Sequence, residues 1–186
     1  MSAIRVRRVL EETIPLIIFF ATVELVSGGF LSTMTKEMEM LPGLLILIPP
    51  LLDMRGNIGS SLGARLSSGL HMGVVRTNRI TRDLKTNIYS SLIMSILMAS
   101  MLSVISWATC IFASGICIPL EMFALISVLT GFLSGIILTA LAVIISIFSF
   151  SRGLDPDDVV SPAIGALGDV STVICLFIVI KFVVGI

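Results

Sequence analysis

The sequence predicts an all-α, polytopic membrane protein with five transmembrane helices, and two observations carry that prediction. The first is composition, because 56% of the 186 residues are hydrophobic and only 13% are charged, against about 25% in a typical soluble protein. The second is patterning. Four apolar runs are long enough to cross a hydrocarbon core, and a fifth begins apolar and turns polar partway. The five runs cover about residues 14–34, 42–69, 88–114, 121–149 and 161–184.

The first run, 14–34, is predicted to be a retained membrane helix. Arg5, Arg7 and Arg8 precede it, as they would in a signal peptide. The run is nevertheless long enough to span the bilayer, and no small-residue cleavage site follows it. The stretches between runs are short, the longest being residues 70–87. Residues 1–186 are therefore expected to form one transmembrane domain with the lipid bilayer as its surroundings.

The second run, 42–69, is the most informative. Its apolar part, residues 42–52, is too short to cross a hydrocarbon core of about 30 Å, which needs roughly 20 helical residues. Asp53, Arg55, Asn57 and several serines follow without a strong break in the helix. A helix of this kind must be buried in protein or line water. The pattern indicates part of a path for a polar solute.

The last run, 161–184, is preceded by clear signals for the start of a helix. Asp155 and Pro156 are typical of a helix start, and Ser161-Pro162 repeats that signal where the membrane helix itself is expected to open. Asp157 and Asp158 follow in the first turn, where acidic residues favour the helix dipole. These three aspartates, Asp155, Asp157 and Asp158, either cap the helix or form a cation site at the cytoplasmic mouth of the path.

Basic residues are distributed unevenly between the two sides that five spans create. Eight lie on one side and two on the other. The positive-inside rule makes the richer side cytoplasmic, which places the N-terminus inside and the C-terminus outside. The eight are Arg5, Arg7, Arg8, Arg76, Arg79, Arg82, Lys85 and Arg152, and the two are Lys36 and Lys181.

Asp169 is the main candidate for an ion-binding residue. It lies eight residues past Ser161, or about 12 Å along a helix, which is near the middle of the bilayer. A carboxylate at that depth usually faces a cavity or a partner. The structural alternative is a protonated carboxyl or one bonded to a neighbouring helix. Small and polar residues recur on the same helical face and allow close approach: Ser161, Gly165, Gly168 and Thr172.

Asp53 and Asn57 form the second candidate pair, because residues four apart share a helix face. Both offer oxygen ligands, and Gly56 keeps the helix thin beside them. Arg55 can be neutralised by Asp53 or by Glu24. Glu24 lies midway along the first run, and it is either a path-lining carboxylate or the partner of that buried arginine.

Several function classes are disfavoured. The net charge is zero, so nothing suggests a nucleic-acid partner. No Walker, H-E-x-x-H or G-x-S-x-G motif occurs, so the chain is not predicted to be an enzyme or an ATP-driven pump. Cys110, Cys117 and Cys175 form no CxxC pair and are interpreted as small buried hydrophobic residues.

Three segments together resemble the MgtE family of magnesium transporters and its eukaryotic solute-carrier relatives. The first is the proline-spaced second run with Arg-Gly-Asn at 55–57 and glycine at 59. The second is Ala-Arg-Leu-Ser at 64–67, which is more like the solute-carrier branch. The third, 155–169, contains Asp-Pro, Ser-Pro and Gly-Asp. The resemblance covers nearly the whole chain.

This resemblance implies a homodimer in the cell membrane that carries a divalent cation, Mg²⁺ first, along the second and fifth spans. It implies Asp169 from both subunits as the central ion site, with Asn57 lining the path. Ser61 stands where the bacterial family has glutamine, and the family's cytoplasmic regulatory region is not found here. Two rivals stay open: a divalent cation exchanger driven by Na⁺ or H⁺, and a membrane scaffold that transports nothing.

Overall fold

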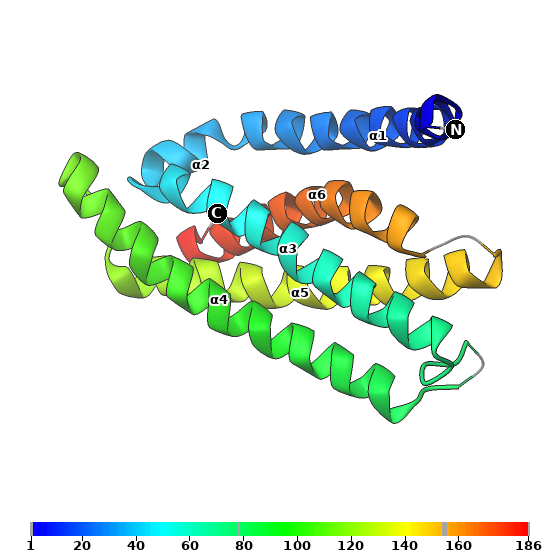
Figure 1. Ribbon diagram of the computed structural model, residues 1–186. Helices are drawn as coiled ribbons and strands as arrows, with labels where there is room; N and C mark the ends of the chain where they lie inside the picture. The colour runs from blue at the N-terminus through cyan, green and yellow to red at the C-terminus, as the bar shows by residue number, and fades with distance from the viewer. Residues whose placement is uncertain (1, 78, 154–155, 186) are drawn as a thin grey trace.

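The computed structural model describes the backbone of all residues except 1, 78, 154–155 and 186, and the side chains of those residues except 2–13, 16, 37, 114 and 157–158. The described chain is all-helical, as predicted (Figure 1). The elements are α1 (Ser2–Thr33), α2 (Thr35–Met40), α3 (Leu44–His71), α4 (Arg82–Ser114), α5 (Leu120–Ser151) and α6 (Pro156–Val184).

Each of the five predicted runs falls in one of the long helices, and only the short α2 was not anticipated. Within the described residues, three helical segments are long and apolar enough to cross a membrane: Arg82–Ala113, Leu120–Ser151 and Val159–Val184. A shorter apolar segment, Ile17–Thr33, lies in α1. The composition of these helices makes the chain a multi-pass membrane protein.

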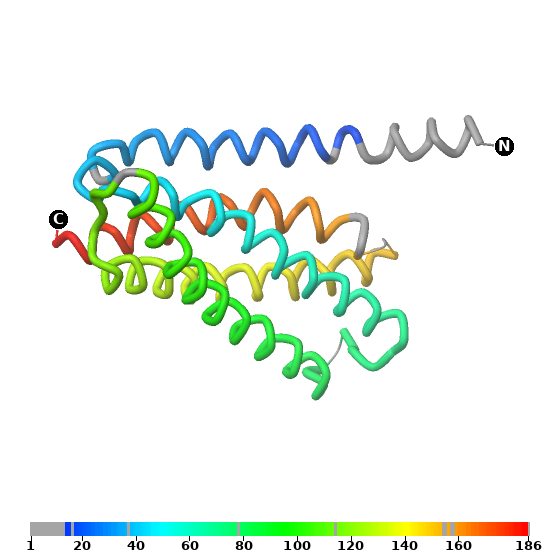
Figure 2. Tube along the Cα trace, turned by 60° about the vertical axis from the view of Figure 1, so that its left-hand side comes forward, coloured from blue at the N-terminus to red at the C-terminus, as the bar shows by residue number. Residues whose placement is uncertain are grey.

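The helices form a bundle in which α6 holds a central place. It packs against α1, α3 and α5, while α3 also packs against α4 and α5. Figure 2 shows α1 running along one side of the bundle, beside α6. The chain reverses direction at each connection between long helices, so α6 ends at the opposite end of the bundle from the start of α1 (Figure 1).

Local sequence explains where the helices begin and end. Thr81 caps α4, because its hydroxyl accepts the backbone N–H of Leu84 at 3.3 Å. Gly115 ends α4 in a left-handed conformation with φ of 68°, which glycine adopts without steric cost. Pro49 and Pro50 lie inside α3, which continues through them as far as His71.

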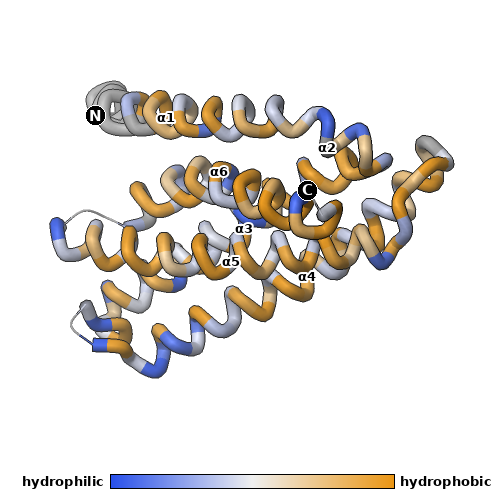
Figure 3. The backbone as a smooth tube through the Cα atoms, turned by 180° about the vertical axis from the view of Figure 1, so that it is seen from behind, coloured by the Kyte–Doolittle hydropathy of each residue, from blue (hydrophilic) through white to orange (hydrophobic). Residues whose placement is uncertain are grey.

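Apolar side chains fill the bundle and also cover its outside. Leu44, Leu47 and Phe123 are fully buried in one cluster, whereas Leu62 and Ile164 lie in a second. Many large apolar side chains on α1 and α4 remain exposed, as lipid-facing residues would be. Figure 3 shows hydrophobic colour along most of the long helices and hydrophilic residues gathered near the loops.

The interpretation of the cysteines as small buried hydrophobic residues is confirmed for the burial of Cys110 and Cys175, but it missed a disulfide. Cys110 and Cys117 form a disulfide, with their Cα atoms 6.2 Å apart. Cys110 is at the end of α4 and Cys117 is in the turn before α5, so the bond closes that turn on itself. Spacing of seven residues across a helix end gave no sign that the two side chains would meet. Cys175 is a buried free cysteine, as expected.

Candidate functional site: carboxylates from three helices

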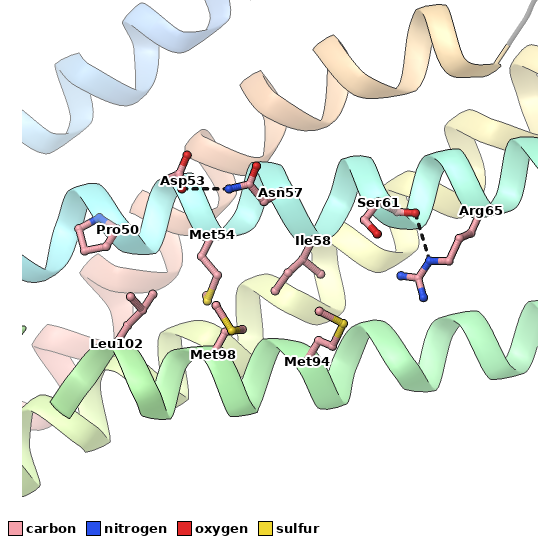
Figure 4. Close-up of a pocket in the computed structure, with 10 residues that line it drawn as sticks. All are labelled: Pro50, Asp53, Met54, Asn57, Ile58, Ser61, Arg65, Met94, Met98 and Leu102. Atoms are coloured by element: carbon pink, nitrogen blue, oxygen red, sulfur yellow. Dashed lines mark hydrogen bonds between the residues drawn. The ribbon is translucent and has the colours of Figure 1, made fainter. Parts of the chain in front are cut away.

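Asp53 and Asn57 lie side by side on α3, as their spacing predicted. The Asn57 side-chain amide donates to a carboxylate oxygen of Asp53 at 2.9 Å. Both side chains are exposed, and Figure 4 shows them projecting from the same side of the helix. The bond fixes their relative orientation and leaves the other Asp53 oxygen and the Asn57 carbonyl as potential oxygen ligands.

The same stretch of α3 borders a groove of about 230 Å³ between α3 and α4. Figure 4 shows Met94 and Met98 on α4 facing α3 across this groove. Ser61 and Arg65 lie toward its other end, where the Arg65 Nε donates to the backbone carbonyl of Ser61 at 3.1 Å. The groove is therefore apolar along its floor and polar along its α3 rim. Met94 and Met98 line the groove from the α4 side.

Asp169 is half-buried on α6 and belongs to a group of three carboxylates. Glu24 on α1 and Asp53 on α3 are both close enough to repel its negative charge electrostatically. Glu24 faces α6 near Gly165, since a β-carbon on that glycine would lie 3.9 Å from a Glu24 carboxylate oxygen. Three helices that are distant in sequence thus direct acidic groups toward a common space. Glu24 is not an ion-pair partner of Arg55.

Small residues bring α3 and α6 together beside this space. A β-carbon on Gly59 would collide with Ile164, and one on Gly63 would contact Val160. Between these two contacts, the Ser161 hydroxyl donates to the hydroxyl of Ser60 at 3.3 Å. The G-x-x-x-G spacing at 59–63 therefore serves helix packing, its usual meaning.

The remaining predicted site residues occupy different surroundings. Gly56 is partly exposed beside Asn57, with no atom within 4 Å of where a β-carbon would be. Gly168 packs against Leu138 of α5. Thr172 is buried, and its hydroxyl donates to the carbonyl of Gly168 at 2.7 Å. Asp155 and the side chains of Asp157 and Asp158 lie outside the described residues.

The predicted neutralisation of Arg55 by Asp53 or Glu24 was wrong. Arg55 points into the bundle, is fully buried, and donates from Nη1 to the Ser95 hydroxyl at 2.9 Å. Sequence analysis missed the residues that receive it, Ser95 on α4 and Gly131 and Gly135 on α5. The four-residue spacing of those glycines within an apolar run was the available signal.

The oxygen ligands of Asp53, Asn57, Glu24 and Asp169 suit a hard cation that keeps part of its water shell. Carboxylate and amide oxygens are the ligands that Mg²⁺ and Ca²⁺ prefer, and Mg²⁺ usually keeps several of its waters. Across the described part of the chain, no three histidine, cysteine or acidic side chains are close enough together to hold a bare ion. One subunit therefore supplies an acidic surface without a closed coordination site.

Comparison with known proteins agrees with these features. Residues 48–179 match the MgtE family, described as divalent cation transporters. A curated rat protein (Rattus norvegicus), solute carrier family 41 member 3, is 28% identical over 152 residues, covering 75% of this chain. The chain spans 31% of the length of that relative. No solved structure matches. The matched segment contains α4, α5, most of α3 and most of α6, so this chain belongs to the MgtE family of divalent cation transporters and is not an enzyme.

Proposed function

We propose that this protein forms a Mg²⁺ pathway in the cell membrane, lined by α3 and α6 and centred on Asp169. The observation that carries the proposal is that Asp169 lies on α6 while Glu24 and Asp53 lie on the two helices, α1 and α3, that pack against α6, with the Glu24 carboxylate facing Gly165 of α6. The Asp53–Asn57 pair adds oriented oxygens beside them. An exposed group of oxygen ligands at bilayer depth attracts a divalent cation and can hold it through its waters.

A homodimer completes this site. One subunit lacks a closed set of metal ligands among its described residues, whereas two copies related by a two-fold axis would present two Asp169 carboxylates to one ion. Without an ion these charges repel one another, and a bound cation relieves that repulsion. Binding through water keeps the ion releasable, which conduction requires.

The orientation follows from charge. The eight basic residues at the N-terminus and in the loops near Arg79 and Arg152 are placed in the cytoplasm. The turn that holds the Cys110–Cys117 disulfide then lies outside, where disulfides persist in most organisms. These two independent features favour the same topology, with the C-terminus outside.

The deciding experiment is Mg²⁺ uptake into proteoliposomes that contain the wild type or Asp169→Asn, with no Na⁺ or pH gradient. The substitution removes the charge and keeps the shape, so we expect uptake to fall to background while the oligomeric state stays unchanged. Phe182→Ala is the matched control, because Phe182 is a 79% exposed residue on the same helix and its loss should leave uptake intact.

Two other outcomes would replace the proposal. Wild-type uptake that appears only with a Na⁺ or H⁺ gradient would identify a coupled exchanger, in which the three carboxylates act as a relay. No uptake under any gradient, together with a stability change in Asp169→Asn, would identify a membrane scaffold.

A further inference from the structure

The buried guanidinium of Arg55 lies apart from the carboxylates of the proposed pathway. Its side chain is fully buried, and its Nε and Nη2 have no hydrogen-bond partner among the described residues. An arginine stays charged at any physiological pH. A charge held inside a protein with one hydrogen bond is costly, and in a membrane protein such a residue usually marks a functional requirement.

The guanidinium lies in a notch formed by two glycines of α5. A β-carbon on Gly135 would come 3.0 Å from Arg55 Nη1, and one on Gly131 would come 3.1 Å from Nη2. The same added atom at Gly135 would also lie 3.0 Å from the Ser95 hydroxyl. Because Gly131 and Gly135 carry no side chain, α5 leaves room for the planar guanidinium. Ser95 on α4 accepts a hydrogen bond from its Nη1.

Helix geometry connects this notch to the ion-binding face. At 3.6 residues per turn, Asp53 and Asn57 each lie about 160° around α3 from Arg55. A side chain fixed between α4 and α5 thus turns Asp53 and Asn57 away from α5. The base of Arg55 also contacts α6, because a β-carbon on Gly168 would lie 3.9 Å from Arg55 Cβ. Gly168 directly precedes Asp169.

We propose that Arg55 is a positioning residue, which sets the rotation of α3 and its distance from α6 so that Asp53, Asn57 and Asp169 face the pathway. This inference rests on the proposed function for its meaning in transport, but the rotation of α3 can be measured without transport. The group acts through its shape and its position, since the two glycines leave room for the planar guanidinium and Ser95 accepts a hydrogen bond from its Nη1.

The test uses single-cysteine reporters on α3 in a Cys175→Ala background that retains the Cys110–Cys117 disulfide. Asn57→Cys replaces an exposed residue and Leu62→Cys a fully buried one. In otherwise native protein, a water-soluble maleimide should label position 57 much faster than position 62. Arg55→Met removes the fork at similar volume, and such replacements usually leave a protein folded.

We expect Arg55→Met to reduce the difference in labelling rate between positions 57 and 62, and to lower Mg²⁺ uptake on the order of tenfold or more, as small misplacements of functional groups do. Gly135→Ala, which crowds the notch, should change both measurements in the same direction but less. Gly29→Ala is the control, because no atom lies within 4 Å of its added β-carbon, and it should change neither.

Two results would overturn the proposal. One is unchanged labelling in Arg55→Met with uptake lost, which would show that the charge of Arg55 matters and its position does not. The other is unchanged labelling and uptake in both Arg55→Met and Gly135→Ala. If the wild type carried no Mg²⁺, the proposed function would fail while the labelling pattern still tested the positioning role.

Discussion

At the scale of single residues, Asp53 offers a test of how charge contributes to ion binding. Asp53→Asn keeps an oxygen that can accept the Asn57 amide but removes one negative charge near Asp169. We expect the Mg²⁺ concentration for half-maximal uptake to rise about tenfold, which corresponds to about 1.4 kcal/mol and is the order of magnitude for one partly screened charge near the ion. Glu39→Gln is the control, since Glu39 is exposed on α2. Equal effects of the two substitutions would argue against a local role for Asp53.

Residue spacing predicted which side chains share a face and failed to predict what they touch. The four-residue interval between Asp53 and Asn57 was enough to expect their neighbourhood, because it depends on one helix alone. The partner of Arg55 depends on how α4 and α5 lie against α3, and no periodicity within α3 carries that information. A space created by two glycines, Gly131 and Gly135, is harder to predict from sequence than a binding site made of charged residues.

At the scale of elements, the apolar runs located five long helices because hydrophobic length is a strong signal in membrane proteins. The short α2 was not predicted, because its six residues, TKEMEM, form neither a long segment nor an apolar face. The half-polar α3 was expected to remain helical, and it does so through Pro49 and Pro50 and as far as His71. The polar second half of α3 is too hydrophilic to face lipid, and the neighbouring helices α4, α5 and α6 pack against it.

The disulfide gives a prediction about the turn between α4 and α5. Cys110 is buried against Gly43, the residue before α3, so the bonded turn packs against the end of the bundle. Reduction should lower the stability of the folded protein by about 2–3 kcal/mol, the loss expected for a short closed loop. Thermal unfolding in detergent with and without reductant measures it. The Cys110→Ser variant should not respond to reductant, and an unchanged wild-type transition would contradict the prediction.

At the scale of the whole molecule, the arrangement is the reason we propose a second copy. Glu24, Asp53 and Asp169 come from α1, α3 and α6, three elements separated by most of the sequence. They leave an acidic surface on one side of the bundle, while Arg55 is buried on the other side of α3. A hydrated divalent ion can bind such a surface, and a facing copy would enclose it. The proposed pathway at a two-fold axis rests on this asymmetry within each subunit.

The dimer can be tested by cross-linking through α6. If Asp169 from two copies shares one ion, then Asp169→Cys in a Cys175→Ala background should form a disulfide-linked dimer under mild oxidation in native membranes. Ile178→Cys is the control, since nine residues further on the side chain lies on the opposite face of the helix, where Ile178 is 55% exposed. Mg²⁺ should not protect the cysteine variant, because its ligand is gone. Cross-linking at 178 and none at 169 would place the pathway away from the two-fold axis and leave each subunit to conduct alone.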